Sequence, residues 1–454
     1  MKMCALFLLS LLARLPLATQ EPAKPSPVEI AARQVVQNLV AGEFEKVEAQ
    51  YDGAVAAALP AGKLGDGWKS LIQQVGPFEA IVETQSSKMN ELDSVKLVCK
   101  FQNVILDAHV IFDSDGKIAG LNFQPHKQPE PDWVPPTYAK PDSFTEQPLS
   151  VVNGKFELPG TLTIPKGDGP FPAIVLVQGS GPHDQDETIG PNKPFEDLAW
   201  GLGSRGIAVL RYTKRTLKYG GKSSEDPAKL TVDDEVISDA RAAVALLAKQ
   251  PKINSARVFL LGHSLGAYLA PRIAAGDSQI AGIVLLAGNT RPIEQLVVEQ
   301  IRYLATQSGA TDEKTKTAIA SAEETEKRIE STDLKPTDKV PLLGASTPGS
   351  YWLDLRAYQP VETAKQLKIP ILILQGGLDY QVTPANFDDW TKALSANKNV
   401  TLKLYPDLNH LFLAGSGASV PQEYEKPGHV AETAVIDIAA WIAQGDKPAK
   451  AGGS

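Results

Sequence analysis

Several features that would define other classes of protein are scarce in this 454-residue chain. It has two cysteines, Cys4 and Cys99, and removal of an N-terminal leader would leave Cys99 without an intrachain disulfide partner. The formal net charge of -8 argues against a nucleic-acid partner, because binding a phosphate backbone needs a basic patch. The apolar run from Met3 to Ala13 is too short to span a membrane as a helix. What remains is a composition ordinary for a globular protein, in a chain long enough for two or more domains.

The N-terminal residues have the layout of a secretory signal. Lys2 gives a positive start, the run from Met3 to Ala13 gives a short apolar core, and Ala18 gives a small residue at its exit. We therefore predict a signal peptide over residues 1–20 and a bacterial protein that is secreted or periplasmic. Arg14 and the imperfect cleavage site leave an uncleaved membrane anchor as the alternative.

Residues 28–124 have the pattern of a small α+β domain. Apolar residues recur at helical spacing between Val28 and Tyr51, and alternating strands follow, with an Asp-Gly turn at 113–116. Helices followed by an antiparallel sheet are typical of this class, and the order resembles the cone-shaped NTF2-like folds. We find no acid–base constellation in this region. We expect it to bind, to shield a pocket or to form a homodimer.

A proline-rich segment, residues 125–143, separates this region from a second one. Such a segment is expected to be an extended, semi-rigid linker. Residues 144–446 alternate apolar strands with helices, which predicts a mostly parallel sheet with helices on both faces. Between about 289 and 368 the alternation stops, and helix-like runs there predict a helical cap.

The most informative segment is a short apolar strand that runs into Gly262-His263-Ser264-Leu265-Gly266 and then into a helix-like run. In that context G-x-S-x-G is a nucleophile elbow, a sharp turn that exposes a serine hydroxyl at the top of a sheet. Small residues two positions before and after the serine let strand and helix approach closely. Ser264 is therefore the predicted nucleophile.

A nucleophilic serine needs a histidine base and a carboxylate that orients the base. In this fold the acid and then the histidine follow the serine along the chain. Asp379 ends a continuous apolar strand and His410 follows the next strand, so we predict them as acid and base. Asp354 and Asp407 are the competing carboxylates. His263, inside the elbow, is expected to pack or to line the pocket.

The oxyanion of a tetrahedral intermediate needs backbone N–H donors. Leu265, directly after the nucleophile, is expected to give one. The glycine-rich loop after the strand at 171–177 is expected to give the other from Ser180, with Gly181 as the nearby alternative. The loop continues with acids to Glu187, but no second cluster accompanies them. We therefore predict a polar, partly solvated rim there, and neither a metal nor a cofactor.

Two further groups of side chains are candidates for roles around this site. Three basic residues are expected to orient the loop after Ser180 by pairing with Asp184 or Asp186. They are Arg211, Lys214 and Arg215. Three aromatic residues of the cap are candidates for lining the acyl pocket, or alternatively for anchoring the cap to the core. They are Tyr351, Trp352 and Tyr358.

Four stretches together carry a resemblance to a known family: Gln178–Pro182, Asp184–Gly190, Arg211–Arg215 and Gly262–Gly266. Over about residues 145–445 the chain resembles the α/β-hydrolase superfamily, in particular bacterial EstD-like carboxylesterases that carry an extra N-terminal domain. The resemblance implies Ser264, Asp379 and His410 as the catalytic triad, and short-chain ester hydrolysis. Ala267 departs from the pattern, because many relatives have glycine there. We expect that change to affect packing or pocket shape more than chemistry.

These features predict a secreted serine carboxylesterase that hydrolyses short- to medium-chain carboxylic esters through an acyl-enzyme. Its expected partner is a small-molecule ester. A serine peptidase or thioesterase of the same fold is the alternative, although a peptidase needs a charged clamp for a peptide terminus and CoA substrates fit poorly with export. A catalytically silent binding protein of the same fold is the alternative from another class, and the complete set of triad residues argues against it.

Overall fold

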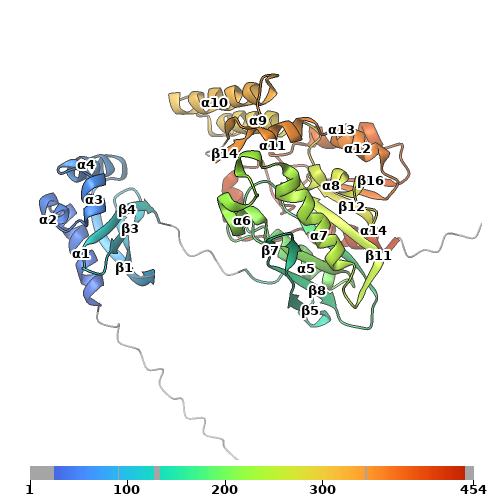
Figure 1. Cartoon of the computed structure of the whole chain (residues 1–454), viewed down its shortest axis with the longest axis horizontal. Helices are drawn as coiled ribbons and strands as arrows, with labels where there is room; N and C mark the ends of the chain where they lie inside the picture. Colours follow the sequence, from blue (N-terminus) through green and yellow to red (C-terminus); the bar gives the residue numbers. More distant parts are fainter. Residues whose placement is uncertain (1–24, 90–91, 127–132, 343–344, 445–454) are drawn as a thin grey trace, which may run out of the picture. The chain divides into compact units, whose positions relative to one another are not determined.

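The computed structural model describes residues 25–89, 92–126, 133–342 and 345–444, and the chain divides into two compact units, Met1–Pro129 and Glu130–Ser454 (Figure 1). Each unit has its own hydrophobic core. The predicted signal peptide, residues 1–20, lies outside the described residues. Among the helices of the described ranges, none is long and apolar enough to cross a membrane.

The N-terminal unit packs helices on one antiparallel sheet. Its helices are α1 (Pro27–Val40), α2 (Phe44–Glu48), α3 (Gly53–Ala58) and α4 (Lys63–Val75), and its strands, paired in sequence order, are β1 (Phe78–Met89), β2 (Leu92–Phe101), β3 (Ile105–Phe112) and β4 (Ile118–Pro125). Helix α1 begins at a capping box, in which the side chains of Ser26 and Glu29 each accept the other residue's backbone N–H. The α+β organisation that the sequence predicts is confirmed. The narrower NTF2-like resemblance and the homodimer stay predictions.

The core of the N-terminal unit follows from the helical spacing of α1. Val35, Val36 and Leu39 lie on one face of the helix and are buried in the same cluster as Leu97 and Cys99 of β2. Burial raises the pKa of the Cys99 thiol to about 11. Cys99 is therefore a packed, neutral thiol and not a reactive one.

The second unit is built on an eight-stranded sheet. Its strands are β5 (Phe144–Pro148), β8 (Gly160–Pro165), β9 (Phe171–Val177), β10 (Ala208–Tyr212), β11 (Ile253–His263), β12 (Ile280–Leu286), β15 (Ile371–Gly376) and β16 (Val400–Tyr405), with a separate small hairpin of β6 (Val151–Asn153) and β7 (Phe156–Leu158). The spatial order is β16-β15-β12-β11-β9-β10-β8-β5. The pairs β5·β8 and β8·β10 are antiparallel and all others are parallel. The predicted mostly parallel sheet is therefore confirmed.

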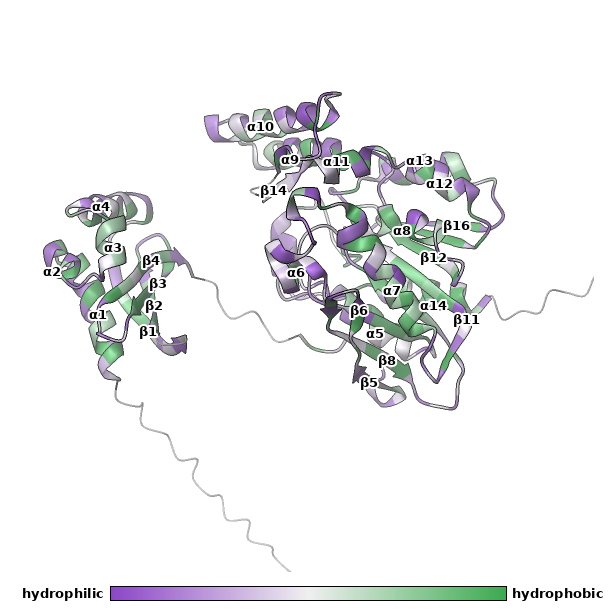
Figure 2. Ribbon diagram, viewed as in Figure 1, coloured by the Kyte–Doolittle hydropathy of each residue, from purple (hydrophilic) through white to green (hydrophobic). Residues whose placement is uncertain are grey.

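Helices cover both faces of this sheet because its central strands are apolar on both sides. In β9, Ile174 and Leu176 pack in a core with α5 (Pro194–Gly203) and α14 (Glu432–Gln444). Val175 and Val177 point the other way, into a core with α7 (Ser238–Leu247) and α8 (Leu265–Ala275). Figure 2 shows the same pattern, with hydrophobic central strands and a largely hydrophilic α10 (Glu313–Glu330).

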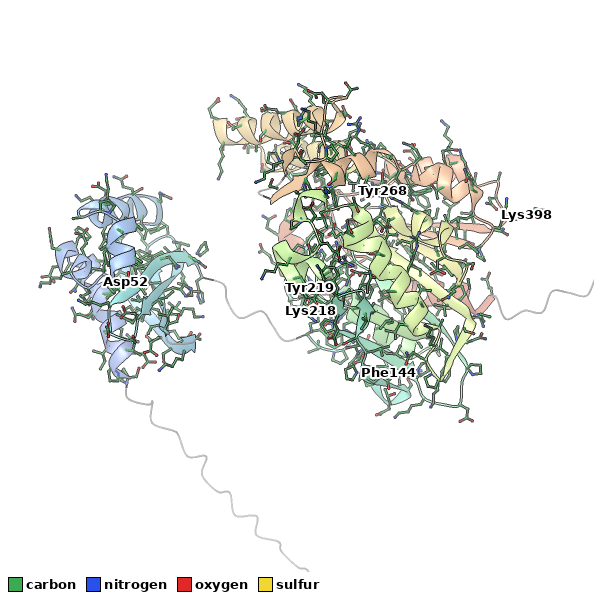
Figure 3. The ribbon with its side chains drawn as sticks, viewed as in Figure 1. Asp52, Phe144, Lys218, Tyr219, Tyr268 and Lys398 are labelled. Carbon is green, nitrogen blue, oxygen red and sulfur yellow. The ribbon has the colours of Figure 1, made fainter. Side chains whose placement is uncertain are left out.

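The predicted cap interrupts the alternation between β12 and β15. It contains α9 (Ile293–Ser308), α10, a hairpin of β13 (Lys339–Leu342) and β14 (Ala345–Pro348), α11 (Gly349–Arg356) and α12 (Pro360–Gln366). Helices α9 and α10 pack on each other, whereas α12 packs on α8 and on α13 (Pro384–Leu394). The cap was predicted over about 289–368. Its last helix, α12, therefore belongs to the layer of helices that covers the sheet. Tyr268 of α8, labelled in Figure 3, lies where these elements meet and accepts a hydrogen bond at its carbonyl from Tyr358.

The second half of the predicted linker, 125–143, belongs to the second unit. The Trp133 indole donates to Asp197 at 3.0 Å, and the Tyr138 hydroxyl donates to the Val430 carbonyl at 2.7 Å. Tyr138 is also buried in the core beneath α5 and α14. The proline count suggested an extended spacer throughout, but two aromatic residues among the prolines dock this part of the chain.

Candidate active site

Ser264 lies in a strained turn between β11 and α8. Its backbone has φ 52° and ψ −114°, a region that side-chain-bearing residues rarely adopt. A Cβ on Gly262 would lie 2.2 Å from the Gly266 carbonyl, and a Cβ on Gly266 would lie 2.2 Å from the Val177 carbonyl. Only glycine fits at both positions, so strand and helix approach as a nucleophile elbow requires.

Asp379 and His410 meet at the carboxyl ends of two adjacent parallel strands, β15 and β16. His410 Nδ1 lies 2.7 Å from Asp379 Oδ2, and both side chains are buried. The Asp379 Oδ1 atom accepts the backbone N–H groups of Gln381 and Val382 at 2.8 and 2.9 Å. Gln375 donates to Oδ2 at 3.1 Å. The carboxylate is therefore fixed in orientation, and it can in turn fix the imidazole.

The two competing carboxylates are engaged elsewhere. Asp354 pairs with Arg272 at 2.7 Å, and Asp407 is an exposed turn residue. Among the described residues, neither makes a hydrogen bond or an ion pair with the His410 side chain. The structure therefore brings the predicted acid and base together.

The residue before Ser264 contacts the predicted base: the ring centroid of His263 lies 4.7 Å from that of His410. This contact brings the elbow close to the Asp379–His410 pair. In the described part of the chain the Ser264 hydroxyl makes no hydrogen bond to His410. Catalytic hydrogen bonds of free enzymes are often long and shorten when substrate binds, so the missing hydrogen bond does not argue against the pairing.

The loop after β9 lies against Ser264, the predicted nucleophile. A Cβ on Gly179 would stand 3.2 Å from the Ser264 Cβ. The Gly179 N–H is already used, since it donates to Glu187 Oε1 at 2.5 Å. Among the described residues, the N–H groups of Ser180 and Leu265 donate to no protein acceptor. Neither N–H group is thus committed to another acceptor in the described residues, and their role as oxyanion donors stays a prediction.

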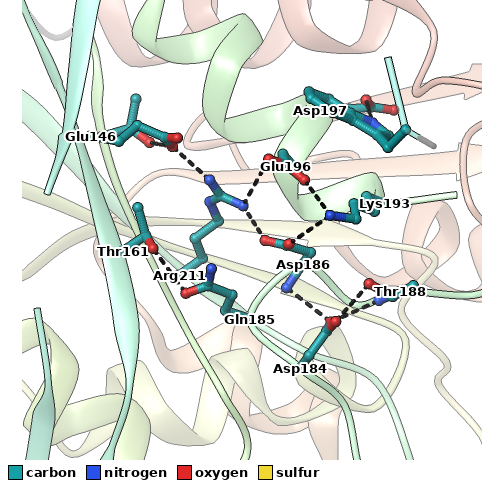
Figure 4. Close-up of polar contacts among 12 residues, drawn as sticks. Glu146, Thr161, Asp184, Gln185, Asp186, Thr188, Lys193, Glu196, Asp197 and Arg211 are labelled. Atoms are coloured by element: carbon teal, nitrogen blue, oxygen red, sulfur yellow. Dashed lines mark hydrogen bonds and ion pairs between the residues drawn. The ribbon is translucent and has the colours of Figure 1, made fainter. Parts of the chain in front are cut away.

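Arg211 is the centre of a buried ion cluster that shapes this loop (Figure 4). It pairs with Asp186, with Glu146 at 2.6 Å and with Glu196 at 3.9 Å. Burial alone would lower the pKa of the Arg211 guanidinium, but the three carboxylates outweigh it and raise that pKa. Burial and the neighbouring Asp186 raise the pKa of Glu196. The predicted Arg211–Asp186 pair is confirmed.

The other two basic residues have partners that the sequence did not indicate. Lys214 pairs with Glu235 at 2.7 Å and donates to the Gly179 carbonyl at 2.8 Å. Arg215 pairs with Asp239 of α7. The prediction that these residues pair with Asp184 or Asp186 is wrong, and no basic side chain of the described residues pairs with Asp184, which accepts from Thr188 instead. Lys214 nevertheless holds the loop, through the Gly179 backbone.

We expect Arg211→Met to lower the free energy of unfolding by about 3–5 kcal/mol, because it removes the buried guanidinium from three carboxylates and leaves only Lys193 to pair with Asp186 and Glu196. Urea denaturation followed by circular dichroism measures the change. The matched control is Arg302→Met, which removes an exposed pair with Glu323 and should cost less than about 1 kcal/mol. Equal effects of the two changes would contradict a structural role for the cluster.

The three cap aromatics use their polar atoms inside the protein. Tyr351 donates to Glu235 at 2.8 Å, and the Trp352 indole donates to Thr347 at 2.8 Å. Both side chains are buried, which favours the anchoring interpretation for them. Tyr358 lines a cavity of about 280 Å³ together with Tyr268. A role of these aromatics in substrate binding stays a prediction.

The loop that follows Ser180 is more buried than the sequence suggested. Glu187 is 1% exposed and Asp186 is 7% exposed, so the expectation of a partly solvated rim is wrong for them. The cause is pairing, since each acid faces a basic group: Arg211 for Asp186, and His263 for Glu187. In the described ranges, no group of three or more His, Cys, Asp or Glu residues is arranged to hold a metal ion.

A mostly parallel sheet with helices on both faces, a serine in a strained strand–helix turn and an acid–histidine pair after later strands define an α/β-hydrolase. The family model described as serine aminopeptidase, S33, matches residues 192–415. A second model, described as a protein of unknown function (DUF3887), matches residues 32–121 in the N-terminal unit.

Esterase EstD of Thermotoga maritima is 42% identical to this chain over 409 residues, which cover 90% of this chain and 93% of that protein. The chain therefore belongs to the EstD family of α/β-hydrolases, and the resemblance that the sequence motifs indicate is confirmed.

Two solved structures are also similar. Esterase PF2001 of Pyrococcus furiosus has a TM-score of 0.44 at 16% identity, over 69% of this chain and 97% of that one. Est1E of Butyrivibrio proteoclasticus has a TM-score of 0.43 at 16% identity, over 65% and 99%. Scores this low carry no argument about function.

Proposed function

We propose that this protein is a serine carboxylesterase that hydrolyses short- to medium-chain carboxylic esters through an acyl-enzyme on Ser264. The observation that carries the proposal is the 2.7 Å contact between His410 and Asp379 beside a serine in a strained turn. Membership of the family of esterase EstD supports an ester as the substrate.

In acylation, the Ser264 Oγ attacks the carbonyl carbon of the ester while His410 Nε2 takes the hydroxyl proton. The carbonyl oxygen becomes an oxyanion, which the backbone N–H groups of Ser180 and Leu265 stabilise. Asp379 holds the Nδ1–H of the imidazole and stabilises the imidazolium that forms. The intermediate then collapses, the ester C–O bond breaks, and His410 gives its proton to the departing alcohol.

In deacylation, the same groups act on water. His410 takes a proton from the water molecule, whose oxygen attacks the acyl carbon, and the same donors stabilise the second oxyanion. Collapse releases the carboxylic acid and returns the proton to Ser264 Oγ. No further cofactor is required by these steps, since each proton that moves is taken up and returned by His410.

We also propose that the protein is exported, on the strength of the signal-like N-terminal sequence. Lys2, the short apolar core and Ala18 support this proposal. Mass analysis of the protein recovered from the periplasm or medium tests it: a mature N-terminus close to residue 20 supports export with cleavage, and an intact N-terminus on cytoplasmic protein contradicts it.

A series of p-nitrophenyl esters from acetate to laurate, matched with p-nitroanilides of the same acyl groups, tests the substrate class. We expect kcat/KM to reach its maximum among the short to medium acyl chains and to be far lower for every anilide. The anilides are the informative comparison because one matching family model is described as a serine aminopeptidase. Faster cleavage of anilides than of esters would replace the esterase proposal with a peptidase.

A further inference from the structure

A second charged pair lies beside the nucleophile and has no part in the steps above. Glu187 and His263 are 1% and 5% exposed, and Glu187 Oε2 lies 3.0 Å from His263 Nδ1. The two atoms are poorly aligned for a hydrogen bond, so their contact is mainly an ion pair. Removing two charges from water costs about as much free energy as their attraction returns, so a buried ion pair adds little stability. Stability alone therefore does not explain why this pair is present.

The atoms of Glu187 and His263 that do not face each other contact two other segments, the loop after β9 and the loop that carries His410. Glu187 Oε1 accepts the N–H of Gly179, the residue before the proposed oxyanion donor Ser180, at 2.5 Å. His263 Nε2 lies 3.0 Å from the backbone carbonyl of His410, the proposed base. His263 itself precedes Ser264. One chain of contacts thus runs from the oxyanion loop, through the residue next to the nucleophile, to the loop that carries the base.

The contacts of the two ring nitrogens favour a doubly protonated His263. A carbonyl oxygen can only accept, so Nε2 carries a hydrogen where it faces the His410 carbonyl, and a positive charge on the ring favours the approach of Nδ1 to the Glu187 carboxylate. Burial by itself lowers the pKa of His263, but the facing Glu187 outweighs burial and raises it. The pKa of Glu187 is lowered, because His263 outweighs the effect of burial there too.

Backbone strain marks the same neighbourhood. Four non-glycine residues of the described chain have a positive φ: Glu187, Ser264, Ala287 and Phe412. Ser264 is the proposed nucleophile and Glu187 is the buried acid. Ala287 directly follows β12, the strand next to β11, and Phe412 lies two residues after the proposed base. Strain of this kind persists only where surrounding contacts over-determine the backbone, and it concentrates at functional sites.

We propose that Glu187 and His263 are positioning residues that hold the oxyanion loop and the His410 loop at fixed places around Ser264. This inference rests on the proposed serine-hydrolase function. Neither residue exchanges a proton with substrate. Their effect arises because reacting groups tolerate little displacement, and a shift of about 1 Å can lower a rate on the order of a hundredfold.

The test compares Glu187→Gln and His263→Asn with wild type. The first change keeps an acceptor for the Gly179 N–H, removes the charge and replaces the oxygen that faces His263 with an NH2 group. The second keeps a donor for Glu187 and loses the donor that reaches His410. The matched control is His429→Asn, the same change in another histidine–carboxylate pair, His429–Asp197 at 2.9 Å, which likewise keeps a donor for the carboxylate.

We expect each of the two variants to lower kcat for p-nitrophenyl butyrate on the order of a hundredfold, with KM within about threefold of wild type. The rate of labelling by a fluorophosphonate should fall in parallel. The kcat of the double variant should be only slightly below that of the less active single variant, because both changes interrupt the same chain of contacts. His429→Asn should keep the wild-type kcat.

Retention of kcat within about threefold by folded Glu187→Gln would overturn the proposal, and so would an equal loss in His429→Asn. A wild type that hydrolyses no ester but labels with the fluorophosphonate would refute the substrate class alone, and the labelling rates of the variants would still decide on positioning. A wild type that neither hydrolyses nor labels would refute both proposals.

If neither variant folds, the wild type supplies the deciding measurement. In ¹⁵N-histidine spectra of the full chain, the assigned His263 should stay doubly protonated as the pH is raised through the range in which exposed histidines titrate. The groups that face it are Glu187, the ring and carbonyl of His410 and, farther away, Asp379, while His183 faces Glu187. A neutral His263 at pH 7 would overturn the proposal, because one of its two contacts would then lack a donor.

Discussion

Ser264→Ala is expected to lower kcat for ester hydrolysis on the order of a millionfold, the loss typical when the nucleophile of an intact triad is removed. The reason is that alanine has no hydroxyl with which to form the acyl-enzyme. KM should change little, because the hydroxyl contributes little to binding the ground state. The measurement is steady-state hydrolysis of p-nitrophenyl butyrate, with enzyme concentrations high enough to detect the residual rate.

Two controls make this result specific. Ser278→Ala changes an exposed serine in the turn between α8 and β12 and should leave kcat unchanged. Circular dichroism should show that Ser264→Ala is folded. Substantial hydrolysis by folded Ser264→Ala would remove Ser264 from the mechanism.

Asp379→Asn is expected to have the second largest effect, a loss of about 10⁴-fold in kcat. The carboxylate accepts from His410 Nδ1 at 2.7 Å and is held by Gln375, Gln381 and Val382. An amide in its place keeps the shape, but it can present an N–H to Nδ1 and so stabilise the wrong imidazole tautomer. It also leaves the imidazolium without a counter-charge.

The matched control for the acid is Asp354→Asn, a change in the competing carboxylate that pairs with Arg272. It should leave kcat within a few-fold of wild type. The two variants are compared by kcat over a range of pH, where Asp379→Asn should regain part of its activity as hydroxide replaces the weakened base. An equal effect of the two changes would mean that Asp379 does not orient His410.

The parts of the site that could be predicted from the sequence are those with a local or ordered signature. Gly262 and Gly266 flank Ser264 at fixed spacing because the turn leaves no space for a Cβ at either position. Asp379 and His410 follow apolar strands in the chain order of this fold, and parallel strands present their carboxyl ends on one edge. The two residues therefore had to lie close together once the strands were recognised.

The parts that could not be predicted depend on contacts between distant segments. Nothing in the sequence around Lys214 indicates that it pairs with Glu235, or that it holds the Gly179 carbonyl. In the same way, the acids after Ser180 have the composition of a solvated loop. Their burial depends on Arg211 and His263, which lie tens of residues away.

The prediction for the linker, residues 125–143, was wrong for its second half. Its proline content predicted an extended spacer, and proline does restrict the backbone in that way. Trp133 and Tyr138 nevertheless pack onto the catalytic unit, since an aromatic ring with a satisfied polar atom gains more from burial than from exposure. Composition averaged over a segment hid the two residues that decide where the segment lies.

The most direct test of the account is to locate the covalent intermediate. Wild-type protein is incubated with a fluorophosphonate, digested, and mapped by mass spectrometry alongside Ser264→Ala. The account predicts one adduct, on the peptide that contains Ser264, formed at the same rate as ester hydrolysis is lost, and no adduct in the variant. An enzyme that hydrolyses esters but carries its adduct on another residue, or loses activity without any adduct at Ser264, would contradict it.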